Sequence, residues 1–121
     1  DTKRGAPAVL TTNNPLVIAP EKSGRLELAK WITSGKNPLT ARVFVNRVWR
    51  WRFGRGIVGT VDNFGVLGDL PTNPALLDWL ALTFVSQDKW SLKSLHKRMM
   101  LSSTYQMSTK YDARAASLDP D

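Results

Sequence analysis

The 121 residues suffice for one domain, and a hydrophobic content of 42% excludes a disordered or collagen-like chain. Seventeen basic and ten acidic side chains give a net charge of +7 with the single histidine neutral, and there is no cysteine. Disulfides, thiolate zinc sites and covalent haem attachment are therefore excluded within this chain. No apolar run approaches the ~20 residues of a membrane-spanning helix, so no membrane span is expected. No targeting signal is recognisable.

The N-terminal part combines an extended segment with a first helix. Three prolines in residues 1–22 exclude an inner strand, so this segment is predicted to be extended, with at most one edge strand at 16–19. Ser23 has the residue type of an N-cap for a helix over 25–34, and Gly35 stands at its C-cap position. An apolar stripe follows one face of this helix: Leu28, Ala29 and Ile32.

The next helix is predicted to be central to the core. Asn37-Pro38 marks its start, because asparagine can accept hydrogen bonds from free N–H groups and proline fits the first helical position. Over 38–52, apolar side chains cover most of the circumference, as in a buried helix. They are Ala41, Phe44, Val45, Val48, Trp49 and Trp51. The opposite side carries Arg42, Asn46, Arg47 and Arg50.

A glycine-rich connection separates this helix from two more. Residues 53–72 contain five glycines without a helical period, so short strands or an ordered functional loop are expected. Asn73-Pro74 repeats the capping pattern and predicts a helix over 74–87. Ser91 is the predicted N-cap of a last helix over 92–103. The core-facing stripes of these helices are Leu76, Leu77, Leu80, Ala81 and Phe84, and then Leu92, Leu95, His96 and Met99.

These elements predict a mostly α fold. About four helices are expected to pack around one core in a helical domain over 23–110, with one long glycine-rich connection. The extended segment 1–22 precedes this domain, and a polar tail over 111–121 is expected to be frayed.

Charge is unevenly divided along the chain. Residues 36–55 carry six basic side chains and no acidic one, whereas residues 56–90 carry four aspartates and one lysine. Such a division indicates surfaces that pair within the fold or with a partner.

Residues 54–61 match the glycine-rich phosphate loop of kinases. A helix precedes these glycines and none is predicted to follow, which does not fit a Rossmann turn. The downstream kinase residues are also missing. We interpret the glycines as ending a helix and shaping turns.

Few residues could carry catalysis. His96 is the only histidine, and carboxylates for acid–base chemistry would have to come from Asp62, Asp69 or Asp78. A fragment of a carbohydrate-directed hydrolase is therefore an alternative function. It requires loop 53–72 to bring a carboxylate within hydrogen-bond reach of His96. One histidine without cysteine cannot build a zinc or iron site, so no metal is expected.

Arginine alternates with aromatic residues over 47–55, which is typical of surfaces that bind nucleic acid. A helix, however, places Trp49 and Trp51 about 160° apart, so the two rings cannot form one stacking platform. Nucleic-acid binding through the basic helix 38–52 is the weaker alternative. Exposed tryptophan and arginine are also the side chains that dominate protein interfaces. The residues expected to form such a surface are Arg47, Arg50, Trp51, Arg52 and Arg55.

An ordered set of motifs over residues 23–120 matches one known family. The stretches are Asn37-Pro38-Leu39-Thr40-Ala41-Arg42-Val43, Val45-Asn46-Arg47-Val48-Trp49, Phe53-Gly54-Arg55-Gly56-Ile57-Val58, Asp62-Asn63-Phe64-Gly65, Pro71-Thr72-Asn73-Pro74 and Trp90-Ser91-Leu92-Lys93-Ser94-Leu95-His96. The chain thereby resembles domain of unknown function 1553, a module that accompanies cytochrome-c-like domains in large planctomycete proteins. One departure is Asp88-Lys89 before Trp90, where a glycine is common in such sequences.

The resemblance implies no established activity and supplies no catalytic residues. Family members are typically exported and multidomain, so the resemblance implies an exported or periplasmic location. Some members carry a haem-binding segment elsewhere in the polypeptide. No cofactor is expected within this chain. The family's domain normally continues past Asp119-Pro120, so this chain is expected to correspond to its first half. We therefore expect a non-catalytic helical module that docks on the remainder of its own polypeptide or on another envelope protein.

Overall fold

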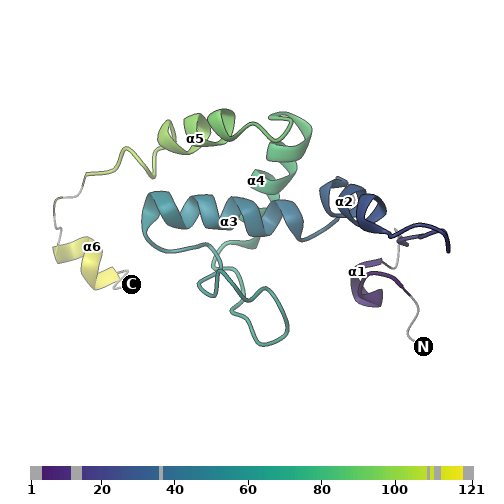
Figure 1. The fold of residues 1–121 in the computed structure, drawn as a ribbon. Coiled ribbons are helices and arrows are strands. Elements are labelled where there is room, and N and C mark those ends of the chain that lie inside the picture. The colour runs from purple at the N-terminus through teal and green to yellow at the C-terminus, as the bar shows by residue number, and fades with distance from the viewer. Residues whose placement is uncertain (1–3, 12–14, 36, 109, 111–112, 119–121) are drawn as a thin grey trace.

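The computed structural model describes residues 4–11, 15–35, 37–108, 110 and 113–118. These residues contain helices and no strand (Figure 1), which confirms the mostly α fold. The four longer helices are α2 (Arg25–Thr33), α3 (Thr40–Phe53), α4 (Pro74–Ser86) and α5 (Leu92–Met100). Two short ones flank them, α1 (Ala8–Thr11) and α6 (Ala113–Leu118). No described helix is long and apolar enough to cross a membrane.

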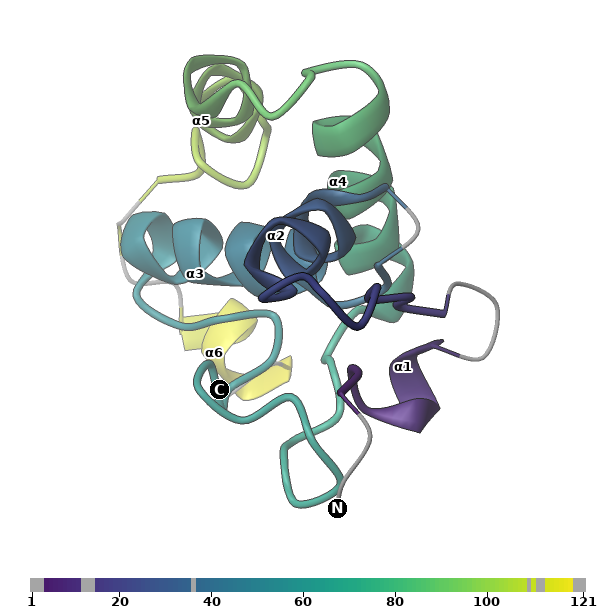
Figure 2. The same cartoon turned by 45° about the vertical axis from the view of Figure 1, so that its right-hand side comes forward.

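Helix α3 is the centre of the arrangement. Among the described elements, α3 and α4 form the most extensive helix–helix contact. In Figures 1 and 2, α5 lies on one side of α3, and the connection between α3 and α4 loops out on the other. This places the glycine-rich connection and α5 on opposite sides of one helix.

Two of the three predicted caps are present. Asn73 Oδ1 accepts from Leu76 N at 3.0 Å, and Ser91 Oγ accepts from Ser94 N. These bonds satisfy N–H groups that a helix leaves unpaired in its first turn, and they confirm where α4 and α5 begin. The predicted start of α3 is wrong by two residues, because the helix begins at Thr40 and its N-cap is Leu39, without a side-chain cap bond. Asn37 Oδ1 accepts from the backbone N–H groups of Leu39 and Thr40, at 3.0 and 3.1 Å, in the turn that leads into the helix.

The predictions for α2 were partly wrong. Ser23 is not its N-cap: Gly24 holds that position with a φ of 83° and no side-chain cap. Ser34, not Gly35, is the C-cap. The predicted stripe is not in the core, because α2 has no buried residue, and Leu28 and Ile32 are 42% and 40% exposed. The stripe is therefore not part of the core formed by the described residues.

Both ends of the chain differ from the prediction. The predicted edge strand at 16–19 does not form, and the short α1 lies within the segment predicted to be extended. In the predicted frayed tail, residues 113–118 form α6. The other tail residues, 111–112 and 119–121, lie outside the described part.

The core is built by α3, α4, α5 and the start of the glycine-rich connection. Its buried residues are Val45, Val48, Ile57, Val58, Leu77, Leu80, Phe84, Leu95 and Met99. Phe84 stacks on Phe44 with ring centroids 5.4 Å apart, and Trp90 meets it edge-on at 5.2 Å. Burying each large side chain contributes about 1.5–3 kcal/mol, so the loop residues Ile57 and Val58 stabilise the fold as helical ones do.

Asn46 departs most from the sequence expectation. It was predicted on the polar side of its helix, but it is fully buried. Its Nδ2 donates to the Val58 carbonyl oxygen at 3.0 Å, and its Oδ1 accepts from Val58 N at 2.9 Å. Because Val58 has no strand partner, the asparagine side chain takes the place of a neighbouring backbone. We call this pair of bonds the Asn46 clamp.

The connection after α3 is an ordered loop, one of the two predicted alternatives. A Cβ at Gly56 would collide with the Val58 carbonyl oxygen and come within 2.9 Å of Asn46 Nδ2, so only glycine fits beside the clamp. Thr72 then closes the loop, donating from both its N–H and its hydroxyl to the Ile57 carbonyl oxygen at 2.8 and 3.1 Å.

Removing the clamp should destabilise the whole domain. We expect Asn46→Ala to lower the free energy of unfolding by about 3 kcal/mol, because both Val58 backbone groups would remain buried without partners. The matched control is Asn63→Ala, which removes the same chemical group from an exposed position that accepts from Gly65 N. The control should cost about 0.5 kcal/mol. The measurement is urea unfolding of both variants. Equal losses of unfolding free energy in Asn46→Ala and Asn63→Ala would contradict the importance of the clamp.

The turn between α4 and α5 holds Lys89 and Trp90 at φ values of 49° and 66°. Residues other than glycine rarely adopt this left-handed backbone conformation, because it costs them about 1 kcal/mol or more. Glycine adopts this backbone without that cost. We therefore predict that Lys89→Gly raises the free energy of unfolding by about 0.5–1 kcal/mol.

The control for this stabilisation is Lys93→Gly, the same exchange inside helix α5. It should lower the free energy of unfolding by about 1 kcal/mol, because glycine is a poor helix former. A loss of stability in both variants, measured by thermal unfolding, would contradict the assigned strain.

Candidate interaction surface

Part of the positive charge of α3 is paired within the fold. Arg42 Nε lies 2.6 Å from Asp78 Oδ1 on α4, and Arg47 lies 2.9 Å from Asp62 in the glycine-rich loop. The basic stretch and the acidic stretch of the sequence thus meet within one chain. Because an aspartate compensates the charge of each of these two arginines, neither is an unpaired cation that could bind a polyanion.

Arg52 contacts α5. Its Nε donates to Nδ1 of His96 at 3.1 Å, which requires that nitrogen to be unprotonated in this arrangement. The bond joins the last turn of α3 to the middle of α5. Arg52 is therefore engaged within the fold, although it was expected on an interaction surface.

The geometry required by the hydrolase alternative is not found in the described residues. His96 bonds to an arginine, while Asp62 and Asp78 each pair with an arginine on α3. Asp69 lies beside Gly59, where its Oδ2 would be 2.7 Å from an added Cβ. The structure does not bring the four candidate residues together. The described residues also contain no group of three or more histidine or carboxylate side chains that could hold a metal.

Sequence reasoning also missed the contacts of Arg98. Arg98 on α5 lies 2.8 Å from Asp88 and sits over the Trp79 ring at 5.6 Å, within cation–π distance. Asp88 and Arg98 were not expected to meet, because the tight turn between α4 and α5 that brings them together has no helical period. This cluster fastens α5 to α4.

Three of the expected interaction residues are free to contact a partner: Trp51, Arg50 and Arg55. Trp51 is 71% exposed, as its place among the expected interaction residues requires and not as its place on the apolar face of the predicted helix suggested. The side chains of Arg50 and Arg55 make no hydrogen bond or ion pair in the described part of the chain. A hollow of about 250 Å³ beside Trp51 is lined by Arg47, Arg50, Val61 and Asp62. We call Arg47, Arg50 and Trp51 the outer α3 surface.

The opposite side of the same helix end carries packed aromatic rings. Trp49 and Phe53 lie 4.1 Å apart between ring centroids, and Tyr105 meets Phe53 edge-on at 5.9 Å. A larger hollow of about 490 Å³ opens beside Trp49 and Phe53, with Arg55 at its boundary. The two tryptophans of this helix end thus contribute to different surfaces.

One carboxyl group has a shifted pKa. The hydrogen bond from Arg42 lowers the pKa of Asp78 below its ordinary value, and burial opposes this only in part. The lowered pKa means that the pair stabilises the folded chain only while Asp78 is ionised.

Comparison with known families agrees with the sequence resemblance. The model of a family described as PSD1, protein of unknown function (DUF1553), matches residues 24–121. No curated protein and no solved structure matches the chain. The match covers well over half of the sequence, and its description assigns no activity.

The lowered pKa of Asp78 predicts a pH dependence of stability. Its folded-state pKa lies below the unfolded value of about 3.9, so its contribution is complete above that value and is lost as pH falls through the folded pKa. We expect a contribution of about 0.5 kcal/mol, because the Asp78 side chain is 50% exposed and solvent screens the pair. The measurement is the free energy of unfolding from about pH 5 to about pH 2.

The test compares Asp78→Asn with Asp69→Asn. The first should lose this part of the acid dependence, whereas the second should keep it, because Asp69 forms no ion pair in the described residues. An unchanged pH profile in Asp78→Asn would contradict the assignment.

Proposed function

Because the chain belongs to the DUF1553 family, which has no assigned function, we propose a function from its surface: a non-catalytic helical docking module of a larger exported protein. The outer α3 surface is the proposed contact with a partner protein. The observation that carries this proposal is an exposed tryptophan beside an unpaired arginine on the central helix of the fold.

Exposed apolar side chains in the glycine-rich loop also support a docking role. Val66, Leu67 and Leu70 are each more than four fifths exposed. Surfaces of this kind mark places where a partner covers the protein.

The chemistry of the outer α3 surface fits a protein interface better than a nucleic-acid site. Tryptophan and arginine are the residues most enriched among interface hot spots. A nucleic-acid site would need several cations of uncompensated charge along one face, but aspartates compensate Arg42 and Arg47. Arg52 keeps its charge, but its bond to His96 holds it toward α5. This arrangement favours a protein contact beside Trp51 over the nucleic-acid alternative.

The proposed partner is the remainder of the protein's own polypeptide or another protein of the cell envelope. The family resemblance supports this choice, since such modules occur in large exported planctomycete proteins, some with a haem-binding segment elsewhere. An exported or periplasmic location and a cytochrome-c-like neighbour belong to the same proposal. In this proposal, the chain itself holds no cofactor.

Site-specific photo-crosslinking tests the proposal in the full-length protein within its source organism. A photoreactive amino acid at position 51 should give a discrete crosslink to another part of the polypeptide or to another exported protein. The matched control is position 93, where Lys93 is exposed on α5. Adding Arg50→Ala should lower the crosslink yield at position 51 about tenfold, as expected for loss of a hot-spot arginine.

Two outcomes would overturn the docking role. One is an equal set of crosslinks at positions 51 and 93, which would mean that the outer α3 surface is not selective. The other is crosslinking of position 51 to nucleic acid, which would favour the alternative function.

A further inference from the structure

The larger hollow at the end of α3 has the composition of a ligand site. Apolar side chains from three parts of the chain line it: Trp49 and Phe53 from α3, Ile57 from the loop and Leu76 from α4. Arg55, Gly56, Thr72, Asn73 and Thr104 complete the lining. Its volume of about 490 Å³ falls within the usual range for ligand pockets. We call it the aromatic hollow.

The walls of the aromatic hollow are fixed before any ligand arrives. Phe53 is held between the Trp49 and Tyr105 rings, and Ile57 is 3% exposed within the core. Gly56 lies beside the Asn46 clamp, where only glycine fits. A ligand would therefore need to order little of the protein, which favours binding.

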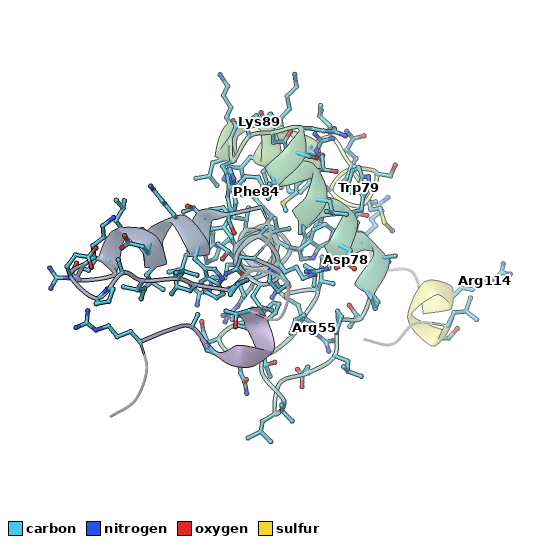
Figure 3. The ribbon with its side chains drawn as sticks, turned by 90° about the vertical axis from the view of Figure 1, so that its right-hand side faces the viewer. Arg55, Asp78, Trp79, Phe84, Lys89 and Arg114 are labelled. Carbon is cyan, nitrogen blue, oxygen red and sulfur yellow. The ribbon has the colours of Figure 1, made fainter. Side chains whose placement is uncertain are left out.

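The charge around the aromatic hollow is positive. Arg55 is exposed and makes no ion pair or hydrogen bond in the described residues, and no acidic side chain lines the hollow. Asn73, the N-cap of α4, adds the positive end of that helix's dipole. Figure 3 shows Arg55 near the N-terminal end of α4, away from Lys89 at the other end. One free guanidinium beside an apolar cavity is complementary to one carboxylate attached to an apolar group.

We propose that the aromatic hollow binds the C-terminal residue of a partner polypeptide, when that residue is large and apolar. Its side chain would fill the space between Trp49, Phe53 and Leu76, while its free carboxylate would pair with Arg55. A C-terminal residue carries both groups on one α-carbon, which matches a single cation next to a single cavity. Capture of a terminal carboxylate is an established mode of peptide recognition.

This site is independent of the proposed docking surface. Trp51 and Arg50 do not line the aromatic hollow, and Trp49 and Arg55 do not line the smaller hollow beside Trp51. Failure of either proposal would therefore leave the other standing.

A nuclear magnetic resonance titration of the isotope-labelled 121-residue chain tests the site. The probe is N-acetyl-phenylalanine, which reproduces a C-terminal phenylalanine, and the comparison probe is its neutral C-terminal amide. We expect saturable shifts of the Ile57 and Leu76 amide signals, with a dissociation constant in the millimolar range. The neutral amide should bind at least about tenfold more weakly, because it cannot form a charge-assisted bond.

The matched variants are Arg55→Gln and Arg50→Gln, each of which removes one exposed cation from the same end of α3. Arg55→Gln should weaken binding of the acid about tenfold and leave binding of the amide unchanged. Arg50→Gln should change neither. Absence of saturable shifts at Ile57 and Leu76, or equal affinity for acid and amide in the unsubstituted chain, would overturn the proposal.

Discussion

Two hydrogen bonds between a buried asparagine and the backbone of one loop residue determine how the rest of the domain is placed. The Asn46 clamp fixes Val58, which brings Ile57 and Val58 into the core between α3 and α4. Thr72 then closes the loop on Ile57, directly before α4 begins. Without the clamp, the crossing of α3 and α4 would depend on the half-exposed Arg42–Asp78 pair and on apolar contacts, which have no directionality.

Local signals in the sequence predicted the helices well. The caps at Asn73 and Ser91 depend on one side chain and the next few backbone amides, so tertiary context hardly alters them. The positions of buried polar side chains depend on tertiary contacts, which the local sequence does not show. Asn46 was expected to face solvent because its residue type is polar, and its partner, Val58, lies in a loop without any period that could reveal the pairing.

The same limit applies to the candidate surface. Helical spacing identified the apolar residues of α3 but could not show which would find a neighbour. It put Trp51 on the apolar face, whereas the alternation with arginine put it on the expected interaction surface, and Trp51 is exposed. Counting charges along the sequence showed the excess of arginine, but it could not show which arginines would pair with an acidic side chain. Arg42 and Arg47 meet aspartates from the acidic stretch, whereas Arg50 and Arg55 are left for a partner or ligand. The structure thus divides one basic helix end into paired cations that hold the fold and unpaired cations that face outward.

The most direct test of the clamp is native-state hydrogen exchange at the Val58 amide. This amide donates to Asn46 Oδ1 within the core, so it should exchange only on global unfolding, with the protection of the slowest amides of α3 and α4. The amides of the exposed residues Val66 and Leu67 should exchange far faster. Exchange of Val58 as fast as that of Val66 and Leu67 would contradict the account, because the loop would then open without unfolding the helices.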